Sequence, residues 1–260
     1  MTPPTLSLKR LESQVAIVTG GGSGFGECMS HLFSAHGAKI VVADMNEANG
    51  RKVADDLTAA GGKAIFVRAD VSVSNDVAAL VHTAVERFGK LDLMVNNAGI
   101  SHANQPLLNV TEEQFDRIFA VNVKSIYHSA IHCVPVFRRQ GGGCFINISS
   151  TGGVRPRPGL TWYNGSKGAA ILLTKSMAVE LAPDKIRVNA INPAMGETAL
   201  LTTFMGGEDT PENRARFTAA IPLGRLSRPA DIANAALFLA DPASSFVTGV
   251  CLDVDGGRCV

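Results

Sequence analysis

A strand, a glycine-rich turn and a helix follow one another near the start of the chain, and this pattern most constrains the fold. Residues 15–19 (VAIVT) form a short apolar run typical of a buried strand. Residues 20–26 (GGGSGFG) come next, and a helical pattern begins within them. Glycines let the backbone approach a pyrophosphate, which binds the free N–H groups and the positive dipole at a helix N-terminus. A flexible turn would explain a lone glycine cluster, so the interpretation depends on the second predicted strand.

An acidic residue ends the second predicted strand. Residues 39–43 (KIVVA) are apolar after the lysine, and Asp44 comes directly after them. An acid at about this distance from a glycine-rich turn hydrogen-bonds the adenosine ribose hydroxyls, and its charge repels a 2′-phosphate. The sequence therefore predicts a dinucleotide site that prefers NAD(H) to NADP(H).

Tyr163 and Lys167 are spaced to lie one turn apart on the same face of a helix, and Ser150 precedes them. A lysine cation beside a phenol favours the phenolate, which suits proton transfer to or from a carbinol oxygen. The spacing also occurs in ordinary helix pairs. The glycine turn and Asp44 favour the catalytic interpretation.

Continuous apolar runs alternate with helical patterns throughout the chain. Such runs are typical of parallel strands covered on both faces, and repeated β–α order implies right-handed crossovers. We expect an α/β, Rossmann-type, doubly wound parallel sheet of about seven strands in a single domain spanning residues 1–260, with its ligand beyond the carboxyl ends of the strands. The predicted strands are 15–19, 39–43, 64–68, 91–95, 144–149, 186–191 and 250–254, and the predicted helices lie near 24–36, 46–60, 74–88, 111–139, 162–182 and 230–240.

Composition excludes several classes of function. The formal net charge of +1 argues against a nucleic-acid or anionic-membrane surface. No apolar stretch approaches the roughly 18 residues of a membrane span, and residues 1–10 lack the apolar core of a signal peptide. The five cysteines show no CxxC pairing, so free thiols and a cytoplasmic location are expected. His128 and His132 could share a metal, but no third ligand is evident, and no metal site is predicted.

Together these motifs resemble the short-chain dehydrogenase/reductase family over nearly the whole chain. The quoted matches are Thr19-Gly20-x-x-x-Gly24-x-Gly26, the run Asn96-Asn97-Ala98-Gly99, the pair Asp70-Val71, and the set Asn122, Ser150, Tyr163 and Lys167.

The resemblance implies a role for each matching residue. Tyr163 would be the general acid/base, Lys167 would lower its pKa and bind the nicotinamide ribose, and Ser150 would orient the substrate oxygen. Asn122 would hold a water for proton relay. The cofactor-binding residues implied in this way, with Asp44, are Gly20, Ser23, Gly24, Phe25, Gly26, Asp70, Val71, Asn97, Ala98, Gly99, Tyr163, Lys167, Pro193 and Thr198.

The chain departs from the family after the sixth predicted strand. Ala194 stands where the family has glycine in a Pro-Gly turn, while Thr198 keeps its place. Because of this difference, the sequence does not predict the backbone conformation at Ala194. We expect the segment around 195–221, which contains Phe204, to act as a lid over the substrate.

Substrate residues are less constrained by the sequence. Arg155 and Arg157, between Ser150 and Tyr163, could bind an anionic or polyhydroxylated substrate, or could face solvent or an interface. Further candidates are Ser150, Trp162, His102 and Phe204.

The helices near 111–139 and 162–182 are apolar around much of their circumference, which exceeds what one sheet face requires. We therefore expect a homo-oligomer, a dimer or tetramer formed through these helices.

The leading prediction is an NAD(H)-dependent oxidoreductase that interconverts a secondary alcohol and its ketone. The alternatives are a 3-oxoacyl carrier-protein reductase and, in another class, a dinucleotide-binding sensor or scaffold without turnover. A small-molecule substrate is expected, and a sugar, a steroid, a cyclic or aryl carbinol and an acyl thioester all remain open.

Overall fold

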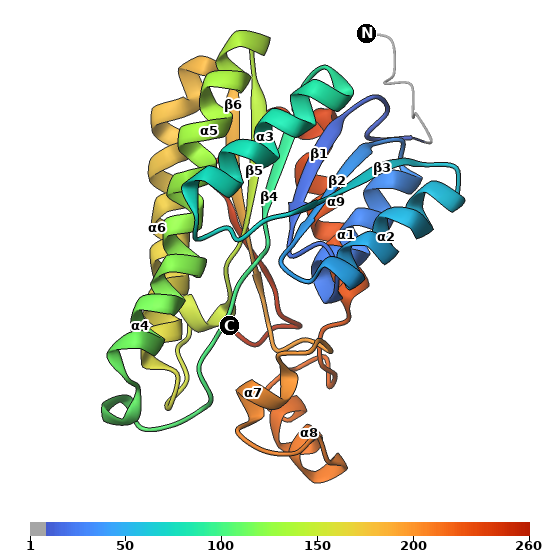
Figure 1. The fold of residues 1–260 in the computed structure, drawn as a ribbon. Coiled ribbons are helices and arrows are strands. Elements are labelled where there is room, and N and C mark those ends of the chain that lie inside the picture. Colours follow the sequence, from blue (N-terminus) through green and yellow to red (C-terminus); the bar gives the residue numbers. More distant parts are fainter. Residues whose placement is uncertain (1–8) are drawn as a thin grey trace, which may run out of the picture.

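The computed structural model describes residues 9–260, so most of the segment tested for a signal peptide lies outside the described residues. Seven strands form one parallel sheet in the order β3-β2-β1-β4-β5-β6-β7 (Figure 1). Strands β1 to β3 follow one another toward one edge of the sheet and β4 to β7 toward the other, so the strand order switches between β1 and β4. The doubly wound sheet predicted from the sequence is confirmed. The strands are β1 (Val15–Thr19), β2 (Lys39–Asp44), β3 (Lys63–Arg68), β4 (Leu93–Asn96), β5 (Gly143–Ile148), β6 (Ile186–Pro193) and β7 (Cys251–Val254).

Helices cover both faces of the sheet (Figure 1). The first group packs on one face and the second on the other, as the two largest apolar clusters show. The first group is α1 (Gly24–Ala35), α2 (Glu47–Ala59) and α9 (Pro229–Ala240); the second is α3 (Ser74–Phe88), α5 (Ser125–Gln140) and α6 (Thr161–Leu181). The remaining helices are α4 (Glu112–Phe119), α7 (Leu201–Met205) and α8 (Pro211–Thr218), with short 3-10 turns at Leu107–Asn109, Thr151–Gly153, Ala182–Asp184 and Pro242–Ser244.

The strands are apolar without alternation because both of their faces are buried. Every residue of β1 is buried, and one face packs on the α1–α9 cluster while the other packs on the α3–α5–α6 cluster. Because parallel strands are buried on both faces, their sequences are continuously apolar, and their positions can be predicted from sequence. All seven strands lie where they were predicted, with boundaries that differ by at most two residues.

The long helix predicted near 111–139 is divided in two. A π-helical turn, Ala120–Lys124, joins α4 to α5 and contains the buried Asn122. A π turn inserts one extra residue into a helix, and such turns are frequent at functional sites. The insertion rotates the side chains that follow it relative to α4.

The segment predicted as a lid extends beyond the carboxyl edge of the sheet (Figure 1). Its helices α7 and α8 contribute Leu201, Met205 and Phe217 to a separate small apolar cluster. Because this cluster is independent of the two main ones, the segment has its own packing and borders the cavity at the carboxyl ends of the strands.

Candidate active site

A cavity of about 390 Å³ lies at the carboxyl ends of the strands, where the sheet order reverses. Ligands of doubly wound sheets bind at this position. The cavity brings together most of the predicted site residues: Gly20, Ser23, Gly24, Phe25, Asp44, Asp70, Val71, Asn97, Ala98, Gly99, Ser150, Arg157, Tyr163, Lys167, Pro193, Thr198 and Phe204 all line it. Gly26, Asn122, Arg155, Trp162 and His102 do not.

The glycine turn is packed too closely for side chains. Gly20 has a left-handed φ of +61°, and a Cβ on Gly26 would lie 2.1 Å from the Gly20 carbonyl oxygen. Thr19 fixes the facing segment, because its hydroxyl donates to the Val95 carbonyl and accepts from the Asn97 N–H at 3.0 Å. Gly26 therefore acts by close packing under the turn rather than by lining the cavity.

Asp44 projects from the end of β2 into the same cavity. One carboxylate oxygen accepts the Gly22 N–H at 3.0 Å, and the other accepts the Asn46 N–H at 2.9 Å. These bonds orient the acid beside the glycine turn, where a ribose attached to the pyrophosphate would lie.

Asp70 is held by an arginine that the sequence interpretation missed. Burial raises the pKa of Asp70, but hydrogen bonds from Ser72 and from Arg117 outweigh it and leave the pKa below its usual value. The Arg117 guanidinium donates to Asp70 at 3.2 Å and also lines the cavity. Nothing in the sequence connects Arg117 to Asp70, because the pairing requires α4 to pack beside the loop after β3.

Tyr163 is buried on α6 and faces the cavity beside Ser150. Burial raises the pKa of Tyr163 to about 12, while hydrogen bonding to Ser150 and the charge of Arg157 act in the opposite direction. Ser150 caps the turn that follows β5, because its hydroxyl accepts the Gly152 N–H at 3.0 Å. The phenol is therefore protonated at neutral pH in this environment.

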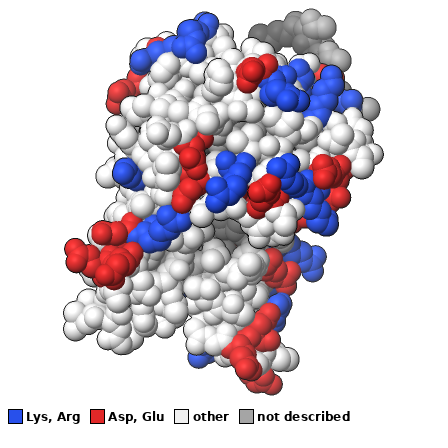
Figure 2. All heavy atoms as spheres, viewed as in Figure 1, with Lys and Arg blue, Asp and Glu red and all other residues white. Residues whose placement is uncertain are grey.

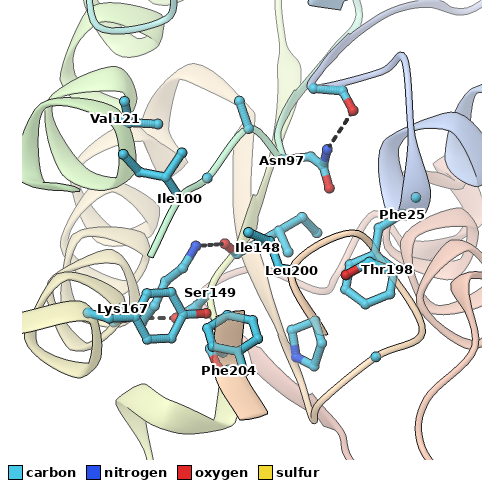
Figure 3. A pocket seen from close by; sticks show the side chains of 18 of the residues that line it. Phe25, Asn97, Ile100, Val121, Ile148, Ser149, Lys167, Thr198, Leu200 and Phe204 are labelled. Atoms are coloured by element: carbon cyan, nitrogen blue, oxygen red, sulfur yellow. Dashed lines mark hydrogen bonds between the residues drawn. The ribbon is translucent and has the colours of Figure 1, made fainter. Parts of the chain in front are cut away.

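Lys167 lies one turn after Tyr163, with its ammonium 5.8 Å from the centre of the phenol ring. Its Nζ donates to the Ile148 carbonyl at 2.9 Å (dashed in Figure 3), and burial lowers its pKa to about 8. The groups that lower the pKa of Tyr163 are Ser150 and Arg157 rather than Lys167. The effect of the lysine on the pKa of the phenol stays a prediction, and in this structure the ammonium bonds the Ile148 carbonyl.

Asn122 lies behind the cavity, and its amide is fully engaged. Its oxygen accepts the Ile100 N–H at 2.9 Å, and its nitrogen donates to the Ile100 carbonyl and to the Ser166 hydroxyl. Ser166 in turn donates to the Tyr163 carbonyl at 2.7 Å. Asn122 therefore connects the π turn to the loop after β4 and to α6.

Ala194, which stands where the family has glycine, is accommodated without backbone strain. Ala194 is buried, lines the cavity and donates its N–H to the Val254 carbonyl at 3.2 Å. Among non-glycine residues 9–260, positive φ occurs at Ser13 and Lys185, so Ala194 needs no glycine conformation. The glycine that close packing does require is Gly196, where a Cβ would lie 2.4 Å from the Phe25 ring.

The substrate candidates separate into two groups. Arg157 and Phe204 line the cavity, with the Phe204 ring 5.1 Å from that of Tyr163. Arg155 is exposed and donates to the Arg258 carbonyl, and the Trp162 Nε1 donates to the Leu107 carbonyl. His102 is buried and its Nδ1 bonds the Ala103 carbonyl.

Apolar residues that the sequence did not single out complete the cavity wall. Figure 3 shows Lys167 on the side where Ile100 and Val121 lie, while Phe25 and Thr198 are on the opposite side. None of the apolar residues has a chemical signature, so only the fold assigns them to the site. Beyond those named, they include Met45, Leu160, Met195 and Leu200.

The two histidines four residues apart on α5 bond different partners. His128 Nδ1 contacts the Val71 carbonyl at 3.1 Å, and His132 Nε2 contacts the Ser74 hydroxyl at 2.9 Å. Each ring is thus used in packing α5 against the α3 region. In residues 9–260, no helix is both long enough and apolar enough to cross a bilayer.

The comparison with protein-family models agrees with the geometry. A model described as enoyl-(acyl carrier protein) reductase, a group of short-chain dehydrogenases, matches residues 20–258. Its range begins at the glycine turn and ends beyond β7, so it includes the whole sheet except β1.

Characterised relatives match over almost the whole chain. A 4-formylbenzenesulfonate dehydrogenase of Comamonas testosteroni is 53% identical, with 95% of this chain and 98% of that protein covered. The 7alpha-hydroxysteroid dehydrogenase of Escherichia coli (strain K12) is 37% identical, with 95% of each chain covered.

A solved structure shares the fold. The 3-ketoacyl-(acyl-carrier-protein) reductase of Brucella melitensis, complexed with NADH, matches with a TM-score of 0.90 and 47% identity. The match covers 96% of this chain and all of that one. The chain therefore belongs to the short-chain dehydrogenase/reductase family of oxidoreductases.

Proposed function

We propose that the chain is an NAD(H)-dependent oxidoreductase that interconverts a secondary alcohol and its ketone, with Tyr163 moving the proton. The observation that carries the proposal is a single cavity in which Asp44 and the glycine turn meet Ser150, Tyr163 and Lys167. A dinucleotide site and a proton-transfer group so placed can serve one reaction.

The residues present fit a dinucleotide. The close packing of Gly26 against Gly20 leaves no side chain between a pyrophosphate and the N-terminus of α1, and Asp44 is oriented for ribose hydroxyls. The relative solved with NADH supports the same cofactor. NAD(H) supplies the hydride acceptor or donor when bound. Thr198 and Lys167 line the cavity from opposite sides, and both would contact the nicotinamide half.

The proton step belongs to Tyr163. A phenol with a pKa near 12 is protonated at neutral pH, so it can donate a proton to a carbonyl oxygen as that oxygen gains charge. Alcohol oxidation requires the reverse transfer, which Ser150 and Arg157 favour because both lower the pKa of the phenol. Ser150 would also hydrogen-bond the substrate oxygen.

The roles of the other predicted residues remain part of the proposal. Asn122, held in the π turn, would keep the loop at Ile100 in place and serve the proton relay. The segment around 195–221 would act as a lid, because Phe204 lies over the Tyr163 ring.

The test is Tyr163→Phe. We expect the turnover of an oxidisable alcohol to fall by about 10²–10⁴-fold while the affinity for NADH, followed by nicotinamide fluorescence, stays within about twofold. Tyr127, the other tyrosine of the chain, is exposed on α5, so Tyr127→Phe is the matched control and should keep full activity. Full activity in Tyr163→Phe would rule out the mechanism.

The nature of the carbonyl substrate is open to two interpretations that the relatives support. The Comamonas relative is named for an aryl aldehyde, which favours an aryl carbonyl or carbinol. The Brucella relative is named as a 3-ketoacyl carrier-protein reductase complexed with NADH, so an acyl thioester substrate is compatible with a site for NADH. Parallel assays with benzylic alcohols and with an acetoacetyl thioester, each with NAD(H), separate them. NADH binding without turnover of any carbonyl would instead favour the sensor or scaffold class.

We also propose that the chain forms a homo-oligomer through α5 and α6. Both helices expose large apolar side chains: Tyr127 and Ile131 on α5, and Leu172 and Val179 on α6, are at least half exposed. Exposed apolar patches of this kind mark association surfaces. Light scattering should give a mass above the 27.3 kDa of one chain, and Leu172→Glu with Ile131→Glu should reduce it.

A reducing cellular compartment such as the cytoplasm fits the five free cysteines. The charged residues on the face in Figure 2 are interspersed in sign, which supports a small-molecule substrate over a nucleic-acid partner.

A further inference from the structure

Arg157 lines the cavity next to Tyr163. It lies on the loop between the turn Thr151–Gly153 and α6, and it is half-buried. Its guanidinium stacks on the Phe217 ring of α8 at 5.4 Å. Within residues 9–260, the guanidinium makes no hydrogen bond and no ion pair, although arginine carries five N–H donors.

The charges around Arg157 do not neutralise it. Arg258 is a second cation nearby, and it is 5% exposed. The groups that could offset Arg157 are Tyr163 and Cys259, but burial raises the pKa of both above their usual values. Both are neutral at physiological pH, so the described residues leave a positive charge at the cavity wall.

The positive charge at Arg157 has an energetic cost. Burial, followed by the repulsion from Arg258, lowers the pKa of Arg157 to about 10, so the guanidinium remains charged at neutral pH. An unpaired, partly desolvated cation is energetically unfavourable unless an anion pairs with it. A perturbed cation at the wall of a cavity is a candidate binding group.

Neighbouring residues hold the arginine in place. The Asn164 amide donates to the Arg157 carbonyl at 2.9 Å, and Asn164 directly follows Tyr163 on α6. Arg155 donates to the Arg258 carbonyl, and Arg258 donates to the Arg155 carbonyl at 3.0 Å. These bonds tie the loop to α6 and to the C-terminal segment, so Arg157 keeps a fixed relation to the phenol.

Aromatic rings of the lid segment contact both Tyr163 and Arg157. Phe204 lies against the Tyr163 ring and Phe217 against the Arg157 guanidinium, so α7 and α8 each contribute one ring. Leu160 and Met195 line the same cavity. A substrate placed here meets a proton-transfer group, an apolar surface and a cation.

We propose that the substrate of this enzyme carries an anionic group, a carboxylate or sulfonate on an apolar body, which Arg157 binds while the carbinol or carbonyl carbon lies at Ser150 and Tyr163. This inference rests on the proposed function, because it assigns a substrate class to the same site. Arginine binds such oxyanions in a bidentate manner, which lysine cannot match. Arg157 is thus the specificity-determining residue of the site.

The chain provides a matched control for Arg157. Arg216 stacks on the same Phe217 ring at 5.0 Å, but it is exposed and lies outside the cavity. Arg157→Met and Arg216→Met each remove one cation from this ring while keeping an unbranched side chain. A role in stacking alone would make the two substitutions equivalent.

The first experiment measures binding without turnover. Benzoate and its neutral isostere benzamide are titrated calorimetrically into the enzyme, with and without saturating NADH. We expect benzoate to bind at least about tenfold more tightly than benzamide, a difference of about 1.4 kcal/mol. Arg157→Met should abolish this preference, Arg157→Lys should retain part of it, and Arg216→Met should retain all of it. Equal binding of the two probes to the unaltered enzyme would overturn the inference.

The second experiment compares turnover of 4-(1-hydroxyethyl)benzoate, a secondary benzylic alcohol, and its methyl ester with NAD⁺. Loss of kcat/KM in Arg157→Met for the anionic alcohol but not for the ester supports the inference, and equal losses for both contradict it. Activity on neutral alcohols without an anion preference would refute the anionic substrate while leaving the oxidoreductase intact. Failure of NADH to bind would instead refute the proposed function, and the benzoate titration without NADH would still decide the role of Arg157.

Discussion

The ring of Phe204 lies 5.1 Å from the ring of Tyr163, with the two planes inclined by 57°. Phe204 belongs to α7, in the segment beyond the sheet, whereas Tyr163 lies on the long helix α6. The contact therefore connects the proposed lid to the proton-transfer group. Aromatic pairs with this geometry contribute about 0.5–1.5 kcal/mol beyond their buried area.

Removing the ring of Phe204 should weaken closure of the lid. We expect Phe204→Ala to lower kcat/KM by about tenfold, because a loss near 1.4 kcal/mol corresponds to that factor, while NADH affinity changes little. Steady-state kinetics and NADH fluorescence titration measure the two effects. Phe246 is fully exposed and outside the cavity, so Phe246→Ala is the control. Unchanged kinetics in Phe204→Ala would show that the ring has no part in closure.

Asp44 should set the preference for NADH over NADPH through its charge. Asp44→Asn keeps an oxygen that can accept the Gly22 N–H but removes the negative charge, whereas Asp44→Ala removes both. We expect NADPH affinity to rise by about tenfold in Asp44→Asn, because repulsion of the 2′-phosphate is relieved. NADH affinity should fall further in Asp44→Ala than in Asp44→Asn. Competitive fluorescence titrations measure both affinities. An unaltered NADPH affinity in both variants would refute the role of Asp44 at the adenosine ribose.

The strands, and the positions of the glycine turn and Asp44 at the ends of strands, could be predicted because their signals are local. Buried parallel strands are continuously apolar, and the glycine turn and Asp44 each follow a strand directly. The expected positions of these elements are confirmed. The short helices α7 and α8 were not predicted, because five and eight residues are too few for a clear helical period.

Features that depend on tertiary packing could not be predicted. The π turn at Asn122 adds one residue within an otherwise helical pattern, so it leaves no break in the sequence. Arg155 and Arg157 are equivalent in sequence, yet one is exposed and bonds the C-terminal segment while the other lines the cavity. The pKa of Tyr163 is dominated by burial, which the spacing to Lys167 does not indicate.

Gly26 should be intolerant of any side chain. A Cβ there would lie 2.1 Å from the Gly20 carbonyl oxygen and 2.6 Å from the Asn97 amide nitrogen, and a backbone atom cannot move aside cheaply. We expect Gly26→Ala to lower the free energy of unfolding by about 1–3 kcal/mol and to weaken NADH binding. Gly165, exposed on α6, has nothing within 4 Å of its Cβ position, so Gly165→Ala should stabilise the chain by about 0.8–1.0 kcal/mol. Denaturant unfolding measures the free energy of unfolding of both variants, and equal changes in Gly26→Ala and Gly165→Ala would contradict the packing argument.

Lys167 should make stability depend on pH in the alkaline range. Burial lowers its pKa to about 8, below the value near 10.4 of an unfolded lysine, so between these pH values the unfolded chain binds more protons. Below pH 8 the buried charge therefore destabilises the fold by up to roughly 3 kcal/mol, and the penalty decreases as pH rises toward 10. Without cofactor, Lys167→Met should be more stable than the unaltered chain at pH 7, and this advantage should shrink at pH 9.5. Lys175 is exposed on the same helix, so Lys175→Met should show no such change in denaturant unfolding. An advantage for Lys167→Met that is the same at both pH values would show that burial of the charge is not its cause.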